Sequence, residues 1–346
     1  MQDTKRPART VLLMLAAALL LALALAPAAR AAQEEETRYL IPVGSAVGIK
    51  LFSDGVLVVG FTDVATDRGT ENPARESGLR EGDVITRLDG QAVNTIEEVQ
   101  AILQDEADRD IDLTIRRDGQ ERDLTIQAVQ CSADGSYKLG AWIRDSMAGI
   151  GTLTFADPET GLFGTLGHGV NDVDTAVLLQ VQSGAITPAS VAGVVKGEDG
   201  RPGELRGAFS ADAQLGTLFA NTEQGVFGHL TDSALLTGEP LPVARADQVH
   251  TGPATILANV SGTEVAEYTV EILKVFDHAP DTRDLMLKVT DKRLLEKTGG
   301  IVQGMSGSPI LQDGRLAGAV THVLIDHADR GYGILATHML EAAEEG

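Results

Sequence analysis

Apolar residues in this chain gather in short runs between glycine-rich turns, a spacing that is typical of β-strands. Such runs lie at residues 150–155, 176–182, 191–195, 269–276, 285–289 and 316–323. Helical periodicity is weak beyond residue 140 until the last few residues. We therefore predict a mostly β protein in which residues 140–346 form antiparallel β-barrels.

Residues 39–128 combine strand and helix patterns. An apolar strand is expected at residues 56–61. Asn72-Pro73 predicts the start of a short helix, since asparagine caps helices and proline suits the first helical position. Residues 95–104 carry apolar side chains at helical spacing. This mixture predicts a compact block with both helices and strands, followed by a polar linker at residues 129–139.

The N-terminus predicts export from the cytoplasm. Lys5, Arg6 and Arg9 precede an unbroken apolar run at residues 11–26, and Ala29-Arg30-Ala31 offers small residues for signal-peptidase cleavage. The run is shorter than the roughly 20 residues of a spanning helix, which favours cleavage, although an uncleaved anchor stays open. We assign residues 1–31 to this signal peptide or anchor and residues 32–38 to an acidic linker.

Composition narrows the classes of function. The chain has 346 residues with 43% hydrophobic content, which is enough for two domains. A net charge of −22 argues against nucleic acid as a partner, because no basic field is available to neutralise phosphates. The single Cys131 excludes an intramolecular disulfide and a cysteine-rich metal site. There is no HExxH motif or phosphate loop, so we expect no metal and no cofactor.

One turn carries the strongest chemical signal, Gly304-Met305-Ser306-Gly307-Ser308-Pro309. A serine between nearby glycines is how chymotrypsin-like peptidases present a nucleophile, since glycine permits the tight turn and leaves room for a substrate carbonyl. The amides of Gly304 and Ser306 are the expected oxyanion hole. Ser308 is the rival nucleophile, but it precedes proline and lacks a glycine two positions before it.

A serine nucleophile needs a base, and His168 in Leu166-Gly167-His168-Gly169 has a similar small-residue setting. His229 follows a glycine too and remains an alternative. His322 lies in the apolar run after the serine, where a strand is expected. The sequence alone leaves the choice among the three open.

The block at residues 39–128 resembles a PDZ domain, most specifically in the run Ala74 to Gln91, a helix followed by the segment GLREGDVITRLDGQ. The resemblance implies a groove between the second strand and the helix at residues 95–104, where a peptide C-terminus would add as an extra strand. Val47, Gly48 and Ile49 are the expected carboxylate-binding loop of that groove.

Together the motifs resemble the stage IV sporulation protein B family of PDZ-linked serine peptidases. The specific stretches are residues 163–169, residues 298–310 and the hairpin at residues 313–323. The resemblance implies an α/β sandwich-like PDZ domain, then a chymotrypsin-like double β-barrel at residues 140–346. It also implies His168 as base, Ser306 as nucleophile and Asp291 as the orienting carboxylate. Asp291 lies only 15 residues before Ser306, and Asp172 and Asp174 stay open as competitors.

The same resemblance implies a biological setting. The protein would act outside the cytoplasm, in the space between forespore and mother-cell membranes, and cleave a membrane-bound regulator of a sigma-factor-processing protease. Self-cleavage near the N-terminus is also implied, and peptide C-termini would bind the PDZ groove. The opposing hypothesis is a non-catalytic PDZ adaptor in the cell envelope.

Overall fold

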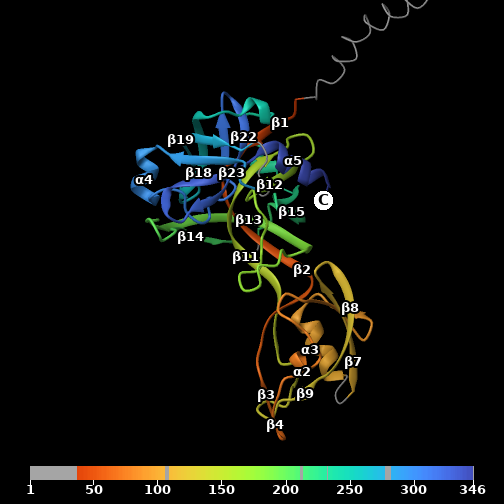
Figure 1. Cartoon of the computed structure of the whole chain (residues 1–346). Helices are drawn as coiled ribbons and strands as arrows, with labels where there is room; N and C mark the ends of the chain where they lie inside the picture. Colours follow the sequence, from red (N-terminus) through yellow and green to blue (C-terminus); the bar gives the residue numbers. More distant parts are fainter. Residues whose placement is uncertain (1–36, 106–108, 211–212, 232, 277–281, 346) are drawn as a thin grey trace, which may run out of the picture. The chain divides into compact units, whose positions relative to one another are not determined.

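The computed structural model describes residues 37–105, 109–210, 213–231, 233–276 and 282–345 (Figure 1). The expected signal peptide or anchor, and residues 32–36 of the linker, lie outside these residues. Among the helices that the structure describes, none has the length and apolar character needed to cross a bilayer.

Two short helices and a set of antiparallel strands form the PDZ part of the chain (Figure 1). Asn72 caps the first helix as expected, accepting a hydrogen bond from the Arg75 amide at 3.1 Å. The PDZ core contains Val58, Ile85, Leu103 and Ile115. The elements are β3 Val64–Thr66, β4 Gly69–Glu71, α2 Pro73–Glu76, β5 Val84–Leu88, β6 Gln91–Ala92, α3 Ile96–Asp105, β7 Asp110–Arg117, β8 Gln120–Gln127, β9 Val129–Gln130 and β10 Tyr137–Lys138.

The first barrel is a ring of strands in the order β11, β12, β16, β15, β13 and β2, each paired antiparallel with the next and β2 closing back onto β11. Its interior holds Leu153, Phe163, Ile186 and Val226. The ring strands are β2 Ala46–Phe61, β11 Ala141–Ala156, β12 Leu162–Thr165, β13 Val181–Val195, β15 Gly216–Thr222 and β16 Gly225–Leu230; β1 Tyr39–Pro42, β14 Glu204–Phe209 and β17 Leu241–Pro242 add at its edges.

The second barrel is closed in the order β18-β19-β20-β23-β22-β21. Ile256, Val270, Leu287 and Ile310 are buried inside it. Its elements are β18 Gly252–Ser261, β19 Glu264–Val275, β20 Leu285–Val289, α4 Lys292–Thr298, β21 Pro309–Gln312, β22 Arg315–Leu324, β23 His327–Leu335 and α5 Ala336–Glu345, with short 3-10 turns at η1 Ser233–Leu235 and η2 Ala246–Gln248 earlier in the chain. Two antiparallel barrels confirm the predicted chymotrypsin-like fold class.

Strands β2 and β11 belong to both parts of the molecule. Near one end Phe61 pairs with Ala141, and near the other Ala46 pairs with Thr152. The first half of β2 also pairs with β13, so residues 46–51 are barrel strand. Residues 39–51, which the sequence pattern assigned to the PDZ block, therefore pair with peptidase strands.

The structure corrects the expected carboxylate-binding loop. Val47, Gly48 and Ile49 are not a loop of the PDZ domain, because they lie near the start of barrel strand β2 and are paired on both edges, with β11 and with β13. Val47 and Ile49 point into the barrel core, and Gly48 packs against the Phe209 ring. A peptide carboxylate cannot reach these backbone amides.

One predicted strand also differs. Residues 176–180 form a turn and loop, and β13 begins only at Val181. Leu179 is buried there, and Asn221 donates to its carbonyl. Apolar content alone therefore misassigned a loop with one buried side chain as a strand.

Candidate active site

The turn with Ser306 lies between α4 and β21, and it is fixed by Thr152 of the first barrel. The Thr152 amide donates to the Ser306 carbonyl at 3.0 Å, and its hydroxyl donates to the Gly304 carbonyl at 2.9 Å. Gly307 has a φ of 94°, and a Cβ there would overlap the Thr152 carbonyl oxygen. Glycine is thus required at this position for the two barrels to approach.

The amides of this turn divide into two groups. Those of Met305, Gly307 and Ser308 donate to backbone carbonyls of Val302, Val320 and Met305. Those of Gly304 and Ser306 have no acceptor within the portion of the chain that the structure describes. Two nearby amides without an acceptor among the described residues are what an oxyanion hole needs, and the sequence predicts this pair.

The rival Ser308 is completely buried and its hydroxyl has no hydrogen-bond partner among the described residues. Ser306, in contrast, is half-buried, and its hydroxyl donates to the Thr321 carbonyl at 2.7 Å. A carbonyl cannot accept a proton in the reaction, so attack requires the Ser306 hydroxyl to turn from this carbonyl toward a base.

His168 follows β12 and lies in the region of that hydroxyl. Its ring centroid is 5.0 Å from that of His322, the residue directly after Thr321. The backbone approaches closely here, because a Cβ on Gly167 would lie 3.0 Å from the Thr321 methyl group. Leu166 and Gly167 both adopt positive φ, at 70° and 69°. Strained backbone of this kind is often found at functional sites.

The hydrogen bond of His168 defines its tautomer. Nδ1 lies 2.8 Å from the Gly169 carbonyl oxygen, which can only accept, so Nδ1 carries the proton and Nε2 of the neutral ring is the basic nitrogen. Burial lowers the pKa of His168, and the bond to Gly169 opposes this in part. A neutral imidazole with an available Nε2 is the form that serves as a general base.

The other two histidines have different settings. His229 is exposed on β16, opposite Leu162 of β12, and its ring lies 5.2 Å from that of Phe219. His322 lies on β22, where its ring is next to that of His168.

Asp291 has a structural position in this fold. Its carboxylate caps α4, accepting from the amides of Arg293 at 2.8 Å and Leu294 at 3.3 Å. The Arg293 guanidinium binds the same carboxylate at 2.8 Å and lowers the pKa of Asp291 to about 2. The structure therefore does not bring Asp291 to His168, whose Nδ1 bonds to Gly169 instead.

Two polar side chains hold the loop after His168: Asn221, which the sequence analysis missed, and Asp172, which it named only as a competitor for the imidazole. Asn221 of β15 binds both backbone groups of Val170, at 2.8 and 2.9 Å, and the Leu179 carbonyl at 2.8 Å. Asp172, almost fully buried, pairs with Arg144 of β11. An asparagine in a strand gives no sequence signal for such a role.

A cavity in the PDZ part has a different lining from the peptide groove that the sequence predicts. A cavity of about 570 Å³ runs between α3 and residues 136–143, lined by Val99 and Leu103 of the helix and by Leu139, Gly140 and Trp142. Residues 141–144 pair with β2 and with no other strand among the described residues, so their second edge is unpaired. An unpaired strand edge beside an apolar helix face is the geometry for strand addition.

Comparison with known proteins decides the family. The model of the SpoIVB peptidase S55 family matches residues 135–340, and a PDZ domain model matches residues 52–128. The chain belongs to the SpoIVB peptidase S55 family. It combines a PDZ domain with an S55 peptidase domain, and the predicted family is confirmed.

Individual relatives match shorter parts. The zinc metalloprotease RasP of Oceanobacillus iheyensis is 26% identical over 110 residues, 32% of this chain and 24% of that protein. The magnetosome formation protease MamE of Paramagnetospirillum magneticum is 36% identical over 87 residues, 25% of this chain and 11% of that protein. The chain thus spans less than a quarter of the length of these two relatives.

Among solved structures, the inactive form of the Rv3671c protease is 17% identical, with a TM-score of 0.35, over 57% of this chain and 83% of that one. The HtrA-type protease AlgW with a decapeptide is 13% identical, with a TM-score of 0.34, over 58% and 53%. The PDZ domain of the SdrC-like protein of Listeria monocytogenes is 22% identical, with a TM-score of 0.22, over 26% and 87%. These TM-scores are too low to support an argument about the fold. The two-barrel fold follows from the strand pairings of this chain.

Proposed function

We propose that this S55 family peptidase acts outside the cytoplasm during endospore formation and cleaves a membrane-associated regulatory protein, with self-cleavage near its own N-terminus. Ser306 is the nucleophile, His168 is the base, and the Gly304 and Ser306 amides bind the oxyanion. The observation that carries the chemistry is a half-buried serine beside two amides that have no acceptor among the described residues.

The reaction follows from these positions. The Ser306 hydroxyl turns from the Thr321 carbonyl to His168 Nε2, which takes its proton as the oxygen attacks a peptide carbonyl. The carbonyl oxygen gains negative charge between the amides of Gly304 and Ser306, and His168 then returns the proton to the leaving amine. The Gly169 carbonyl keeps Nδ1 protonated and so orients the imidazole, the role that the sequence analysis gave to Asp291.

A fluorophosphonate tests the nucleophile. The wild-type protein should be labelled at Ser306, and Ser306→Ala should lose both labelling and self-cleavage while keeping its fold. Ser308→Ala is the matched control and should be labelled. Absence of labelling in the folded wild-type protein would favour the adaptor hypothesis.

The cellular role needs a separate test. In an endospore former that lacks its own SpoIVB peptidase, expression of this chain should restore heat-resistant spores, and the Ser306→Ala variant should not. Restoration by both forms would contradict a proteolytic role in sporulation.

We also propose that the groove between α3 and residues 139–143 binds peptide C-termini. Trp142 is 62% exposed and is the only tryptophan of the chain, so its fluorescence reports on the groove. A synthetic decapeptide with a free C-terminal valine should change this fluorescence, and its C-terminal amide should not.

A charge placed in the groove should weaken that binding. Ala141→Glu puts a carboxylate beside the peptide carboxylate, and like charges should reduce affinity at least about tenfold. Ala148→Glu, exposed on the same strand within the barrel, is the control and should bind normally. Equal affinities of the two variants would place the peptide elsewhere.

A further inference from the structure

The loop that follows His168 is organised around one carboxylate, that of Asp172, which is 1% exposed. Its Oδ1 accepts hydrogen bonds from the amides of Asp174 and Thr175 and from the Thr175 hydroxyl, each at 3.0 Å. These bonds all lie within four residues of the chain. They define the shape of the turn, but they do not fix its place on the barrel.

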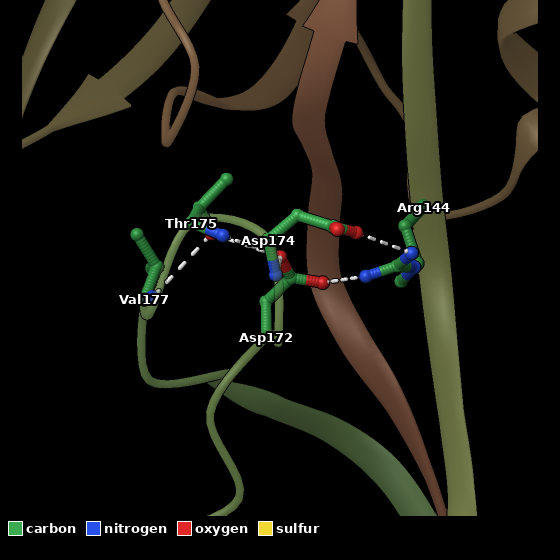
Figure 2. Close-up of polar contacts among 5 residues, drawn as sticks. All are labelled: Arg144, Asp172, Asp174, Thr175 and Val177. Carbon is green, nitrogen blue, oxygen red and sulfur yellow. Dashed lines mark hydrogen bonds and ion pairs between the residues drawn. The ribbon is translucent and has the colours of Figure 1, made fainter.

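Arg144 attaches the turn itself to β11, as Figure 2 shows, in addition to the bonds that Asn221 makes to Val170 and Leu179 on either side of it. Its Nη1 contacts the second oxygen of Asp172, and its Nη2 lies 2.9 Å from an oxygen of Asp174. One guanidinium therefore bridges two carboxylates of the turn. The planar guanidinium of arginine suits this geometry, because its two terminal nitrogens donate to the two carboxylates separately.

The contact is partly removed from water, which strengthens it. The Arg144 side chain is 30% exposed and that of Asp172 is fully buried. Burial opposes ionisation of Asp172, but the hydrogen bonds from Thr175 and Arg144 outweigh it, so the pKa of Asp172 lies below its usual value. Loss of the arginine would leave a buried carboxylate without a cation, which is costly.

Strand β11 connects this attachment to the rest of the site. Arg144 lies on β11 directly after Ile143 of the groove, and Thr152 on the same strand binds the nucleophile turn. Strand β11 thus holds two parts of the site: Arg144 binds the loop that follows His168, and Thr152 binds the Ser306 turn.

We propose that Arg144 is a positioning residue of the peptidase: by clamping Asp172 and Asp174 from β11, it fixes the loop next to His168 relative to the Ser306 turn. This inference rests on the proposed function of His168 and Ser306. It assigns a role in the reaction to a residue that touches neither the nucleophile nor the base.

The test measures the second-order rate of fluorophosphonate labelling for Arg144→Gln, Arg144→Lys and Asp172→Asn. Misplacement of the base should slow Arg144→Gln by about 10- to 100-fold. Arg144→Lys should recover part of the rate, since an ammonium can pair with one carboxylate. The double variant Arg144→Gln/Asp172→Asn should be no slower than the slower single variant, because both changes break the same clamp.

Arg206→Gln is the matched control, because Arg206 is exposed on β14 and its ion-pair partner among the described residues is Glu204, at 3.6 Å. Its labelling rate and thermal midpoint should equal those of the wild type. Asp174→Asn tests the clamp at a half-exposed position, and so remains informative if changes at buried Asp172 prevent folding.

Hydrogen exchange provides a readout that does not depend on activity. The amides of Asp174 and Thr175 should exchange faster in Arg144→Gln than in Arg206→Gln. Wild-type rates of labelling and exchange in Arg144→Gln would overturn the inference. If Ser306→Ala were labelled like the wild type, the proposed nucleophile would be wrong, while the exchange measurement would still decide whether the clamp exists.

Discussion

At the scale of single residues, glycines decide how closely the Ser306 turn and the loop of His168 approach the opposite barrel. Gly307 and Gly167 each lie where a Cβ would press on the opposite barrel. Thr152 then joins the nucleophile turn to β12, since its carbonyl accepts from the Thr165 hydroxyl at 2.7 Å. The chemistry of Ser306 and His168 depends on these less conspicuous neighbours.

The protonation of His168 gives a prediction at this scale. Because burial lowers its pKa below the ordinary value of 6.5, the neutral base should persist into mildly acidic solution. The rate of fluorophosphonate labelling should therefore fall as the pH drops, with a midpoint below 6.5. A pH series on the wild-type protein measures it, and a midpoint at or above 6.5 would contradict the buried-base assignment.

At the scale of elements, the capping of α4 explains why residue 291 is acidic although it does not pair with His168. The first amides of a helix have no partner within the helix. A carboxylate at the N-terminus accepts their hydrogen bonds and interacts favourably with the positive end of the helix dipole. Asp291 does this for the amides of Arg293 and Leu294. It also joins α4 to β19 through the Thr269 amide, at 3.4 Å.

Asp291→Ala should therefore lower stability rather than chemistry. We expect a loss of about 1 kcal/mol in the free energy of unfolding at neutral pH, as for other helix caps. Since the folded-state pKa of Asp291 is depressed, its contribution should be present above the unfolded value of 3.8 and disappear as the pH falls toward about 2. Urea unfolding measures the difference.

Lys292→Ala, an exposed neighbour in the same helix, is the control for that series and should leave stability almost unchanged. Labelling of folded Asp291→Ala should match that of the wild type. A normal stability combined with abolished labelling would restore Asp291 to the catalytic site.

At the scale of the whole molecule, the PDZ part is inserted between two barrel strands rather than appended before them. The chain enters the PDZ part along β2 and leaves it along β11, and these two strands pair antiparallel. Deletion of residues 39–128 would remove β1 and the barrel half of β2, so it should destroy the first barrel rather than spare it.

A cleaner excision joins Leu57 to Arg144, which are paired in the ladder, through an Asn-Gly hairpin turn. This variant keeps the barrel strands and the Arg144 clamp. It should retain labelling of Ser306, lose binding of the decapeptide, and cleave protein substrates more slowly because remote positioning is lost. Loss of labelling in a folded protein would show that the PDZ part itself supports the catalytic geometry.

The sequence by itself determined the local features of this protein. Short apolar runs identified parts of β2, β11, β13, β19, β20 and β22, Asn72-Pro73 located a helix start, and the glycine pattern around Ser306 indicated a nucleophile turn. These signals are local because they depend on backbone preference and on the side-chain period of a single element. The family resemblance, carried by the same stretches, extended them to the fold class.

Only the tertiary structure decided which element each residue serves. The segment Val47-Gly48-Ile49 has the character of a PDZ loop in sequence, yet pairing with β11 and β13 makes it barrel strand. Asp291 and Asp172 are both acidic residues near candidate groups, but one caps a helix and the other anchors the loop of the base. The physical reason is that strand pairing and ion pairing join residues far apart in the chain, and no local pattern records which partners they will meet.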